Sequence, residues 1–396
     1  MKIPTVIYGV IARIINVFVP TKKNHWIFGA DYGESYREGS KYILEYMIKN
    51  HPEYDCTFIV QKKELKKELD LKGIPCEYNM SFRGMIKVAQ ADVVFTSHTP
   101  ADILFVYKKK NRRNYYLVHG QPHKVAMLAR SKEYLEKTGK LKEGIIDKLK
   151  EKINTFFNNG ITCANIEFVS ATSEFLQPFM SNDYLGTVPV KVLGMPRNDA
   201  LFQPERFKNE KWVEGLEGKF VISYLPTHRK YGLGDLSPIP FVNRPEIQEW
   251  MRENNIVLLV KQHPNMVKKL KEVHNSDVIK DISKLGIEAQ VCLYHSDTLI
   301  CDYSGAWFDY LLLKRPTLFY YYDDFNEDDA GTYFDTKDFF SEYICYNEDE
   351  LYDKIKKIKE NYASMCPSEQ LIKKFHKYVD GNSCERYYNE ITKETK

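Results

Sequence analysis

The sequence predicts an α/β protein with two Rossmann-like domains, preceded by an amphipathic helix. Short apolar runs, typical of buried parallel strands, alternate with helical stretches along almost the whole chain. A chain of 396 residues is too long for one ordinary hydrophobic core and suits two. With 43% hydrophobic and 28% charged residues and a net charge of +3, the composition is that of a globular protein.

The first 20 residues are expected to form a helix that associates with a membrane surface. Apolar side chains between Val6 and Phe18 fall on one helical face, whereas Arg13 and other polar residues fall on the opposite face. The stretch between Pro4 and Pro20 is shorter than the roughly 20 apolar residues that a membrane span needs. Packing of this stripe on the protein's own core is the alternative.

Residues 21–205 are predicted to form the first Rossmann-like domain. Its apolar runs predict strands, and the stretches between them predict helices. The expected strands are 26–28, 57–60, 91–96 and 115–118, and the first helices are 40–49 and 62–71.

Residues 206–396 are predicted to form the second Rossmann-like domain, which would end in a C-terminal helix. A loop at 196–210, with two prolines and mixed charge, separates the two alternating series. The expected strands are 220–224, 256–261, 291–293, 298–301 and 317–321, followed by helical residues 369–394 with a break at 380–382.

Tandem sheets of this kind bind ligands at the carboxyl ends of their strands. We therefore expect the site in a cleft where the two domains face each other. Residues that directly follow strands become the candidates for chemistry.

The charge distribution and the cysteine content indicate which binding partners and which cellular compartment to expect. Residues 1–160 carry 28 Lys and Arg against 17 Asp and Glu, whereas the remainder is acidic. A basic half attracts anionic lipid or a polyphosphate chain, and no zinc-finger, RNP or helix-turn-helix signature favours nucleic acid. The eight cysteines are scattered without a C-x-x-C pair and are expected to be reduced core thiols. We expect a peripheral protein on the cytoplasmic face of the cell membrane.

His119 is the candidate general base. It follows an apolar strand and precedes Gly120, so its imidazole is expected at a tight turn on the edge of the site. An imidazole with an ordinary pKa near 6.5 can accept the proton of a hydroxyl group at neutral pH. A surface-turn histidine without catalytic function is the alternative.

The segment after the strand 298–301 is a candidate site for a phosphate. Asp302 and Ser304 precede a predicted helix at 306–313, whose first backbone N–H groups lack helical partners. The Ser304 hydroxyl and the amides of Gly305 and Ala306 would then bind a phosphate group, and an ordinary helix cap is the alternative.

Two further segments offer polar side chains at expected strand ends or in the interdomain loop. Thr227 and Arg229 follow the strand 220–224, and the arginine can bind phosphate through two N–H groups. Arg197, Asn198 and Asp199 could contact a substrate, although Pro-Arg-Asn-Asp is also a good turn sequence.

Six segments in order resemble the CDP-glycerol glycerophosphotransferase family, which includes the primases and polymerases of teichoic acid. The resemblance covers roughly residues 24–390, and the agreement in order makes it specific. The segments are His119 to Lys124, Gly194 to Asp199, Leu225 to Arg229, Lys261 to Pro264, Ser296 to Gly305 and Tyr320 to Asp335.

The resemblance implies transfer of glycerol phosphate from CDP-glycerol to a lipid-linked cell-wall or capsular polymer, with release of CMP. It implies a GT-B architecture, His119 as the base, and His263 as a second catalytic residue that stabilises the phosphoryl oxygens. Gly120 and Lys124 would contact substrate. No metal site and no cofactor besides the CDP-linked substrate are expected.

Three residues depart from the family pattern, and one of them is Ala330, which stands where the family often has an arginine. The family commonly shows His-Gly-Thr-Pro-Leu-Lys, whereas this chain has Gln121 and His123 in that segment. CDP-ribitol therefore remains an alternative donor. A glycosyltransferase of the same architecture that uses a nucleotide sugar, and an inactive scaffold that binds polymer, are the competing functions.

Overall fold

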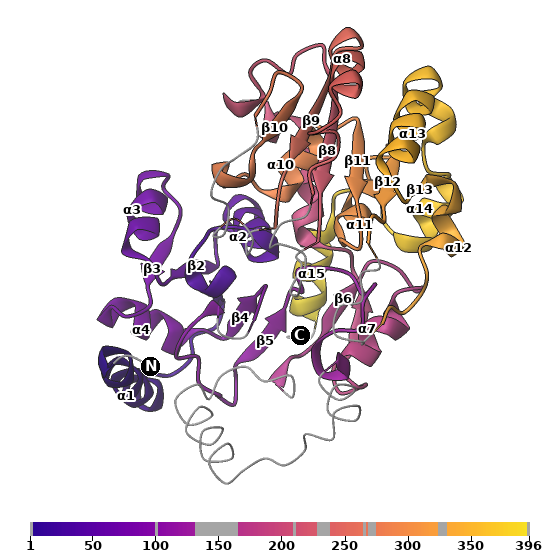
Figure 1. Ribbon diagram of the computed structural model, residues 1–396. Coiled ribbons are helices and arrows are strands. Elements are labelled where there is room, and N and C mark those ends of the chain that lie inside the picture. The colour runs from indigo at the N-terminus through magenta and orange to yellow at the C-terminus, as the bar shows by residue number, and fades with distance from the viewer. Residues whose placement is uncertain are drawn as a thin grey trace. The chain divides into compact units, whose positions relative to one another are not determined.

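The computed structural model describes residues 3–99, 102–130, 165–208, 211–227, 238–263, 267, 275–323 and 331–393. The chain forms two compact units (Figure 1). Unit 1 comprises residues 1–121, 126–199 and 382–396, and unit 2 comprises residues 122–125 and 200–381. The prediction of an α/β chain with two parallel sheets is confirmed.

The core of unit 1 is a parallel five-stranded sheet in the order β3-β2-β1-β4-β5. Its four longer strands are buried along nearly their whole length, which is why they appear in the sequence as continuous apolar runs. The strands are β1 (His25–Phe28), β2 (Asp55–Val60), β3 (Cys76–Tyr78), β4 (Val93–Thr96) and β5 (Arg113–Tyr116). Helices α2 (Glu38–Asn50), α3 (Lys63–Leu71) and α4 (Phe82–Gln90) connect the first four.

The N-terminal helix α1 (Ile3–Phe18) packs against α4 and also exposes apolar side chains. Tyr8, Ala12 and Ile15 pack with the cluster around Met85 and Tyr107. The opposite stripe is exposed and consists of Ile7, Val10, Ile11, Ile14, Val17 and Phe18. The helix therefore has both the core-packed face and the free apolar face that the sequence offered as alternatives.

A second small sheet and the last helix complete unit 1. Strands β6 (Val169–Ala171) and β7 (Val190–Val192) pair in parallel, with α7 (Gln177–Asp183) between them in sequence. Helix α15 (Ser383–Lys393) returns to this unit, where Arg113 donates to the carbonyl of Ile391 and Lys191 pairs with Glu390. The sequence had placed residues 382–396 in the second domain, and these long-range contacts are the reason for the difference.

The core of unit 2 is a parallel six-stranded sheet in the order β10-β9-β8-β11-β12-β13. The strands are β8 (Phe220–Leu225), β9 (Ile256–Val260), β10 (Ile279–Asp281), β11 (Thr298–Cys301), β12 (Thr317–Tyr320) and β13 (Ile344–Cys345). The accompanying helices are α8 (Pro245–Glu253), α10 (Ala289–Tyr294), α11 (Ala306–Leu311), α12 (Lys337–Phe340), α13 (Glu348–Glu360) and α14 (Glu369–Phe375).

The predicted strand at 291–293 is wrong, because these residues lie in helix α10. Gln290, Val291, Cys292 and Leu293 are all buried, so one apolar run fits a buried helix as well as a buried strand. The edge strands β3, β10 and β13 are only two or three residues long and gave no pattern that the sequence analysis could use.

The change from unit 1 to unit 2 falls between Asp199 and Ala200, a few residues before the predicted boundary at 205. The predicted loop there contains two short 3-10 helices, η4 (Pro196–Phe202) and η5 (Pro204–Phe207). Arg197, Asn198 and Asp199 are buried in it rather than exposed in a linker.

Candidate active site

Each sheet has a point where strand order changes direction, and polar residues gather at both. In unit 1 this point lies between β1 and β4, and in unit 2 it lies between β8 and β11. Loops that leave adjacent strands on opposite sides of a sheet diverge at such a point, which is why it is the usual ligand site of open parallel sheets.

The unit 1 site is organised by the buried carboxylate of Asp102. Its Oδ2 accepts hydrogen bonds from the backbone N–H groups of Ser97 and His98, each at 2.8 Å, and its Oδ1 accepts from Tyr32 at 2.9 Å. Desolvation by burial raises the pKa of Asp102, although these N–H groups oppose the shift. The carboxylate thus ties the loop after β1 to the loop after β4.

His119 lies three residues beyond β5, on the neighbouring strand end, and is exposed. The β-branched residue before it, Val118, has a φ of +23°, outside the range that such residues normally adopt. The His119 ring lies parallel to the ring of His98, with 5.3 Å between centroids and 7° between planes. Backbone strain at a polar site is typical of functional positions.

An ion pair fixes the backbone of His119. Nη1 of Arg197 donates to Oε2 of Glu38 at 2.7 Å and to the carbonyl oxygen of His119 at 2.6 Å. Burial would raise the pKa of Glu38, but the charge and the hydrogen bond of Arg197 lower it below its ordinary value. Glu38 itself has a φ of +62° at the start of α2.

The electrostatic surroundings favour a neutral His119. Desolvation by the surrounding protein, together with His98 and Arg197, lowers the pKa of His119 to about 4, against an opposite effect of Glu38. The residue still contacts solvent, so its ring is accessible to a substrate. A neutral, accessible imidazole can accept a proton at pH 7.

The residues that depart from the family pattern in the His119 segment are buried. Oε1 of Gln121 accepts from the backbone N–H of Thr172 at 2.9 Å. His123 packs at 5.0 Å from the ring of Phe334, and burial lowers the pKa of His123 to about 4. These two side chains therefore serve packing rather than an accessible site. Lys124 is half-buried in unit 2.

Asp199 has a structural partner within unit 1. Its two carboxylate oxygens accept from the backbone N–H groups of Ser383 and Cys384, at 2.8 and 2.7 Å, and so cap the N-terminus of α15. Burial raises the pKa of Asp199. Asn198 beside it is also buried.

The unit 2 site is organised in the same way, by Asp302. This carboxyl group is fully buried at the end of β11, and its Oδ1 accepts from the backbone N–H and the hydroxyl of Thr227, at 2.8 and 2.6 Å. The backbone N–H of Ser304 also donates to it at 3.2 Å. Asp302 thus joins the ends of β8 and β11, and it positions Thr227 and Ser304.

The start of α11 and the end of β9 contribute the remaining unit 2 candidates. Gly305 is the N-cap residue of this six-residue helix, and the N–H of Ala306 faces Oγ of Ser304 at 3.4 Å. His263 follows β9, the other neighbour of β8, and is exposed. Arg229 lies outside the described residues.

Two motif glycines border open space. A Cβ atom added to Gly120 or to Gly305 would meet no atom within 4 Å, and neither backbone has a positive φ. Gly305 has a φ of −71°, which alanine adopts easily. Neither packing nor backbone conformation explains these glycines, whereas the close approach of a ligand would.

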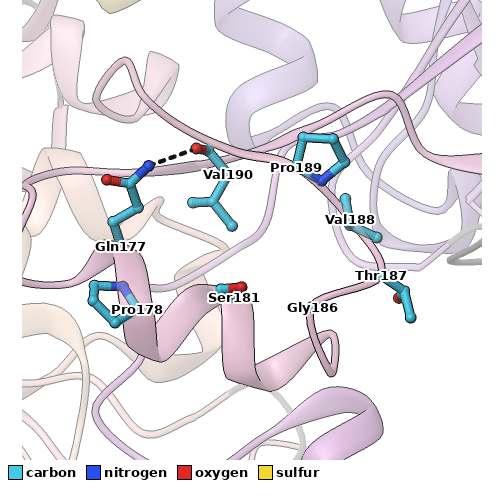
Figure 2. Close-up of a pocket in the computed structure, with 8 residues that line it drawn as sticks. All are labelled: Gln177, Pro178, Ser181, Gly186, Thr187, Val188, Pro189 and Val190. Carbon is cyan, nitrogen blue, oxygen red and sulfur yellow. Dashed lines mark hydrogen bonds between the residues drawn. The ribbon is translucent and has the colours of Figure 1, made fainter.

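A shallow pocket of about 440 Å³ in unit 1 lies away from these residues in sequence (Figure 2). It is formed by α7 and the segment before β7, and one wall is held by the bond from Gln177 to the carbonyl of Val190. Its lining has no charged side chain.

The sequence analysis missed three members of the unit 1 site: His98, Glu38 and Asp102. His98 lies two residues beyond β4, so the strand-end criterion that selected His119 could have found it. Glu38 and Asp102 carried no such signal, because only the folded chain brings them to this edge of the sheet. Among the described residues, no cluster of three His, Cys, Asp or Glu side chains could hold a metal ion.

A model of the family described as CDP-Glycerol:Poly(glycerophosphate) glycerophosphotransferase matches residues 11–393. The Teichoic acid glycerol-phosphate primase of Bacillus subtilis is 28% identical over 50% of this chain and 50% of its own length. The Teichoic acid poly(glycerol phosphate) polymerase of the same organism is 24% identical over 95% of this chain and 49% of its own length. The Teichoic acid ribitol-phosphate polymerase TarL of Staphylococcus aureus is 29% identical over 49% and 35%. The chain thus spans about half, or less, of the length of these relatives.

Solved structures share the fold. The Wall Teichoic Acid Polymerase TagF gives a TM-score of 0.72 at 20% identity and covers 99% of this chain and 92% of its own. A variant of it soaked with CDPG gives the same TM-score at 19% identity, covering 98% and 93%. A UDP-GlcNAc 2-epimerase from Neisseria meningitidis bound to UDP-GlcNAc gives 0.50 at 15%, covering 93% and 99%.

Proposed function

The chain belongs to the CDP-glycerol:poly(glycerophosphate) glycerophosphotransferase family, and we propose that it transfers glycerol phosphate from CDP-glycerol to a hydroxyl of a lipid-linked cell-wall or capsular polymer. The observation that carries the proposal is the pair of strand-end sites, each organised by a buried aspartate. One presents an accessible neutral histidine, and the other presents hydroxyl and amide donors. The names of the relatives support the substrate class.

The proposed reaction is a displacement at phosphorus. The acceptor oxygen attacks the β-phosphorus of CDP-glycerol, the phosphate that carries the glycerol, while His119 takes the proton of the attacking hydroxyl. The bond between this phosphorus and the bridging oxygen breaks, and CMP leaves with that oxygen and its electron pair. General-base assistance of this kind contributes on the order of 10²- to 10⁴-fold in rate.

Unit 2 is the proposed donor side. Thr227, Ser304, Gly305 and Ala306 offer hydroxyl and amide groups to the donor phosphates, with Asp302 positioning the first two. His263 would donate to the phosphoryl oxygens as their charge increases. Arg229 remains a proposed phosphate ligand from the sequence. We propose that these groups stabilise the negative charge of the donor phosphates without a bound metal ion. An unchanged reaction rate after chelation with EDTA is the corresponding test.

Unit 1 is the proposed acceptor side. Gly120 would let the acceptor approach the strand end closely, and Arg197 would hold the His119 loop. Lys124, which follows Gly120 in the same sequence segment, is proposed to contact a phosphate group. Asn198 and Asp199 are buried, so their proposed contribution is to support Arg197 and α15 rather than to touch the polymer.

Membrane association is proposed for α1. Within the part of the chain that the structure describes, no helix is long and apolar enough to cross a bilayer. The six exposed apolar side chains of α1 would insert at the interface, and the basic residues of the first 160 positions would attract anionic lipid. This would bring a lipid-linked acceptor to the enzyme on the cytoplasmic face of the membrane.

CDP-ribitol is the second candidate donor, because ribitol-phosphate polymerases are as similar to this chain as glycerol-phosphate enzymes are. The test incubates the protein with a lipid-linked disaccharide and CDP-glycerol, CDP-ribitol or UDP-GlcNAc. We expect CMP release and a product that is heavier by one or more glycerol phosphate units. Transfer of ribitol phosphate would reassign the donor, and transfer from the UDP-sugar alone would indicate a glycosyltransferase.

A further inference from the structure

His98 occupies the same strand-end edge as His119 but has a different hydrogen-bond environment. It follows β4, and β4 pairs with β5, so the two histidines leave adjacent parallel strands in the same direction. Their rings are parallel, with centroids 5.3 Å apart. His98 is only half-buried.

Three hydrogen bonds fix the position of His98. Its backbone N–H donates to Asp102 at 2.8 Å, and its carbonyl oxygen accepts from the Tyr116 hydroxyl at 2.7 Å. The ring nitrogen Nδ1 accepts from the backbone N–H of Asp31 at 3.1 Å. The backbone and one edge of the ring are therefore held by unit 1 itself.

The bond from Asp31 determines the tautomer of His98. A nitrogen that accepts a hydrogen bond carries no proton, so Nδ1 is unprotonated and the proton of the neutral ring lies on Nε2. Protonation of Nδ1 would break the bond. The bond from Asp31 thus leaves Nε2 of His98 as the ring nitrogen that donates.

That donor has no partner within the described part of the chain, and neither ring nitrogen of His119 has one. The pair presents one fixed N–H donor beside one open proton acceptor. A polyol phosphate has a hydroxyl that loses a proton and, a few bonds away, anionic oxygens that accept hydrogen bonds. The two histidines match these two needs.

We propose that His98 is an acceptor-binding residue, which donates from Nε2–H to a phosphate oxygen of the terminal polyol phosphate while His119 takes the proton of its hydroxyl. This inference rests on the proposed function and specifies which side chain binds the acceptor. The parallel rings would align the terminal unit along the edge of the sheet.

Two substitutions separate the ligand contact from a structural role. In His98→Asn, the amide oxygen can replace Nδ1 as the acceptor for Asp31, but the outer donor is lost. In His98→Gln, the amide N–H can replace Nε2–H as the outer donor, but the bond from Asp31 is lost. The two variants therefore remove the hydrogen-bonding groups of opposite edges of the ring.

The experiment measures CMP release from CDP-glycerol with a soluble oligo(glycerol phosphate) as acceptor. We expect His98→Asn to raise the acceptor KM by about 10-fold or more, as loss of a hydrogen bond to a charged group does, with an unchanged donor KM. His98→Gln should keep most of the acceptor affinity. A wild-type acceptor KM in His98→Asn would overturn the inference, as would equal losses in both variants or a larger loss in His98→Gln.

Calorimetric titration of the same oligomer, without donor, tests the contact independently of turnover. If the wild-type protein binds the oligomer and His98→Asn does not, the contact stands even if CMP release from CDP-polyols is absent and the proposed function fails. If the wild-type protein is active but both variants bind the oligomer as it does, the contact is refuted and the function is retained.

Discussion

The guanidinium group of Arg197 donates to the backbone carbonyl of His119 at 2.6 Å while it pairs with Glu38 at 2.7 Å. The arginine contacts the backbone of the proposed base and leaves its ring free. Through this bond, Arg197 fixes the position of the His119 backbone, although the two residues are 78 positions apart in sequence.

Arg197→Gln should therefore lower kcat by about 10-fold or more with little change in either KM, because small displacements of a catalytic group are costly. Glu38→Gln is the matched control, since it removes the ion pair but keeps the bond from Arg197 to His119. Steady-state kinetics and thermal melting of both variants check this. A fall in melting temperature in Arg197→Gln without a fall in kcat would limit Arg197 to a structural role.

His119→Ala should lower kcat by about 10²- to 10⁴-fold, which is the contribution of a general base. The exposed side chain makes no ring hydrogen bond to the described residues, so the melting temperature should hardly change. His123 cannot take over the role, because it is buried. A variant that keeps more than about a third of wild-type kcat contradicts the assignment.

The pH dependence of kcat/KM should show an acid limb below the pKa of free imidazole. The base acts in its neutral form, and the pKa of His119 is lowered, so activity is lost only when pH falls through this lowered value. Glu38 raises the pKa of His119, so Glu38→Gln should move the limb to still lower pH. Rate profiles from pH 3 to 9 test both points, and a limb above pH 7 in the wild-type protein would exclude His119.

Gly305→Ala should raise the donor KM several-fold while leaving the fold unchanged. The new methyl group would contact no protein atom and suits the local backbone, so the melting temperature should stay the same or rise slightly. Gly120→Ala is the matched control, because it adds a methyl group to equally open space in unit 1 and should affect the acceptor KM instead. An unchanged donor KM in Gly305→Ala would move the donor site elsewhere.

Replacing Ile7, Ile14 and Phe18 together by serine should release the protein from anionic vesicles without unfolding it. These side chains are 55%, 55% and 80% exposed, so the packed face of α1 is left intact. The control replaces Leu71 and Leu285, which are exposed on other elements, by serine. Vesicle flotation at low and high salt is the measurement. Equal flotation of the triple variant and the wild-type protein would rule out membrane insertion of this stripe.

Much of the fold could be predicted, because buried parallel strands carry a local signal. The strands β1, β2, β4, β8, β9, β11 and β12 were all recognised from apolar runs bounded by turn residues. The exception, residues 291–293, shows the limit of this signal, since burial on all sides makes a short helix and a short strand equally apolar.

The sequence by itself determined the candidate residues, and the tertiary structure decided their surroundings. His119, Thr227, His263 and Ser304 could be selected because each follows a strand, and strand ends are a local property. Strand order and long-range packing then placed His98 beside His119, paired Arg197 with Glu38, and used Asp199 to cap α15. Sheet order is set by contacts between residues far apart in the chain, so no local pattern records which polar groups share an edge.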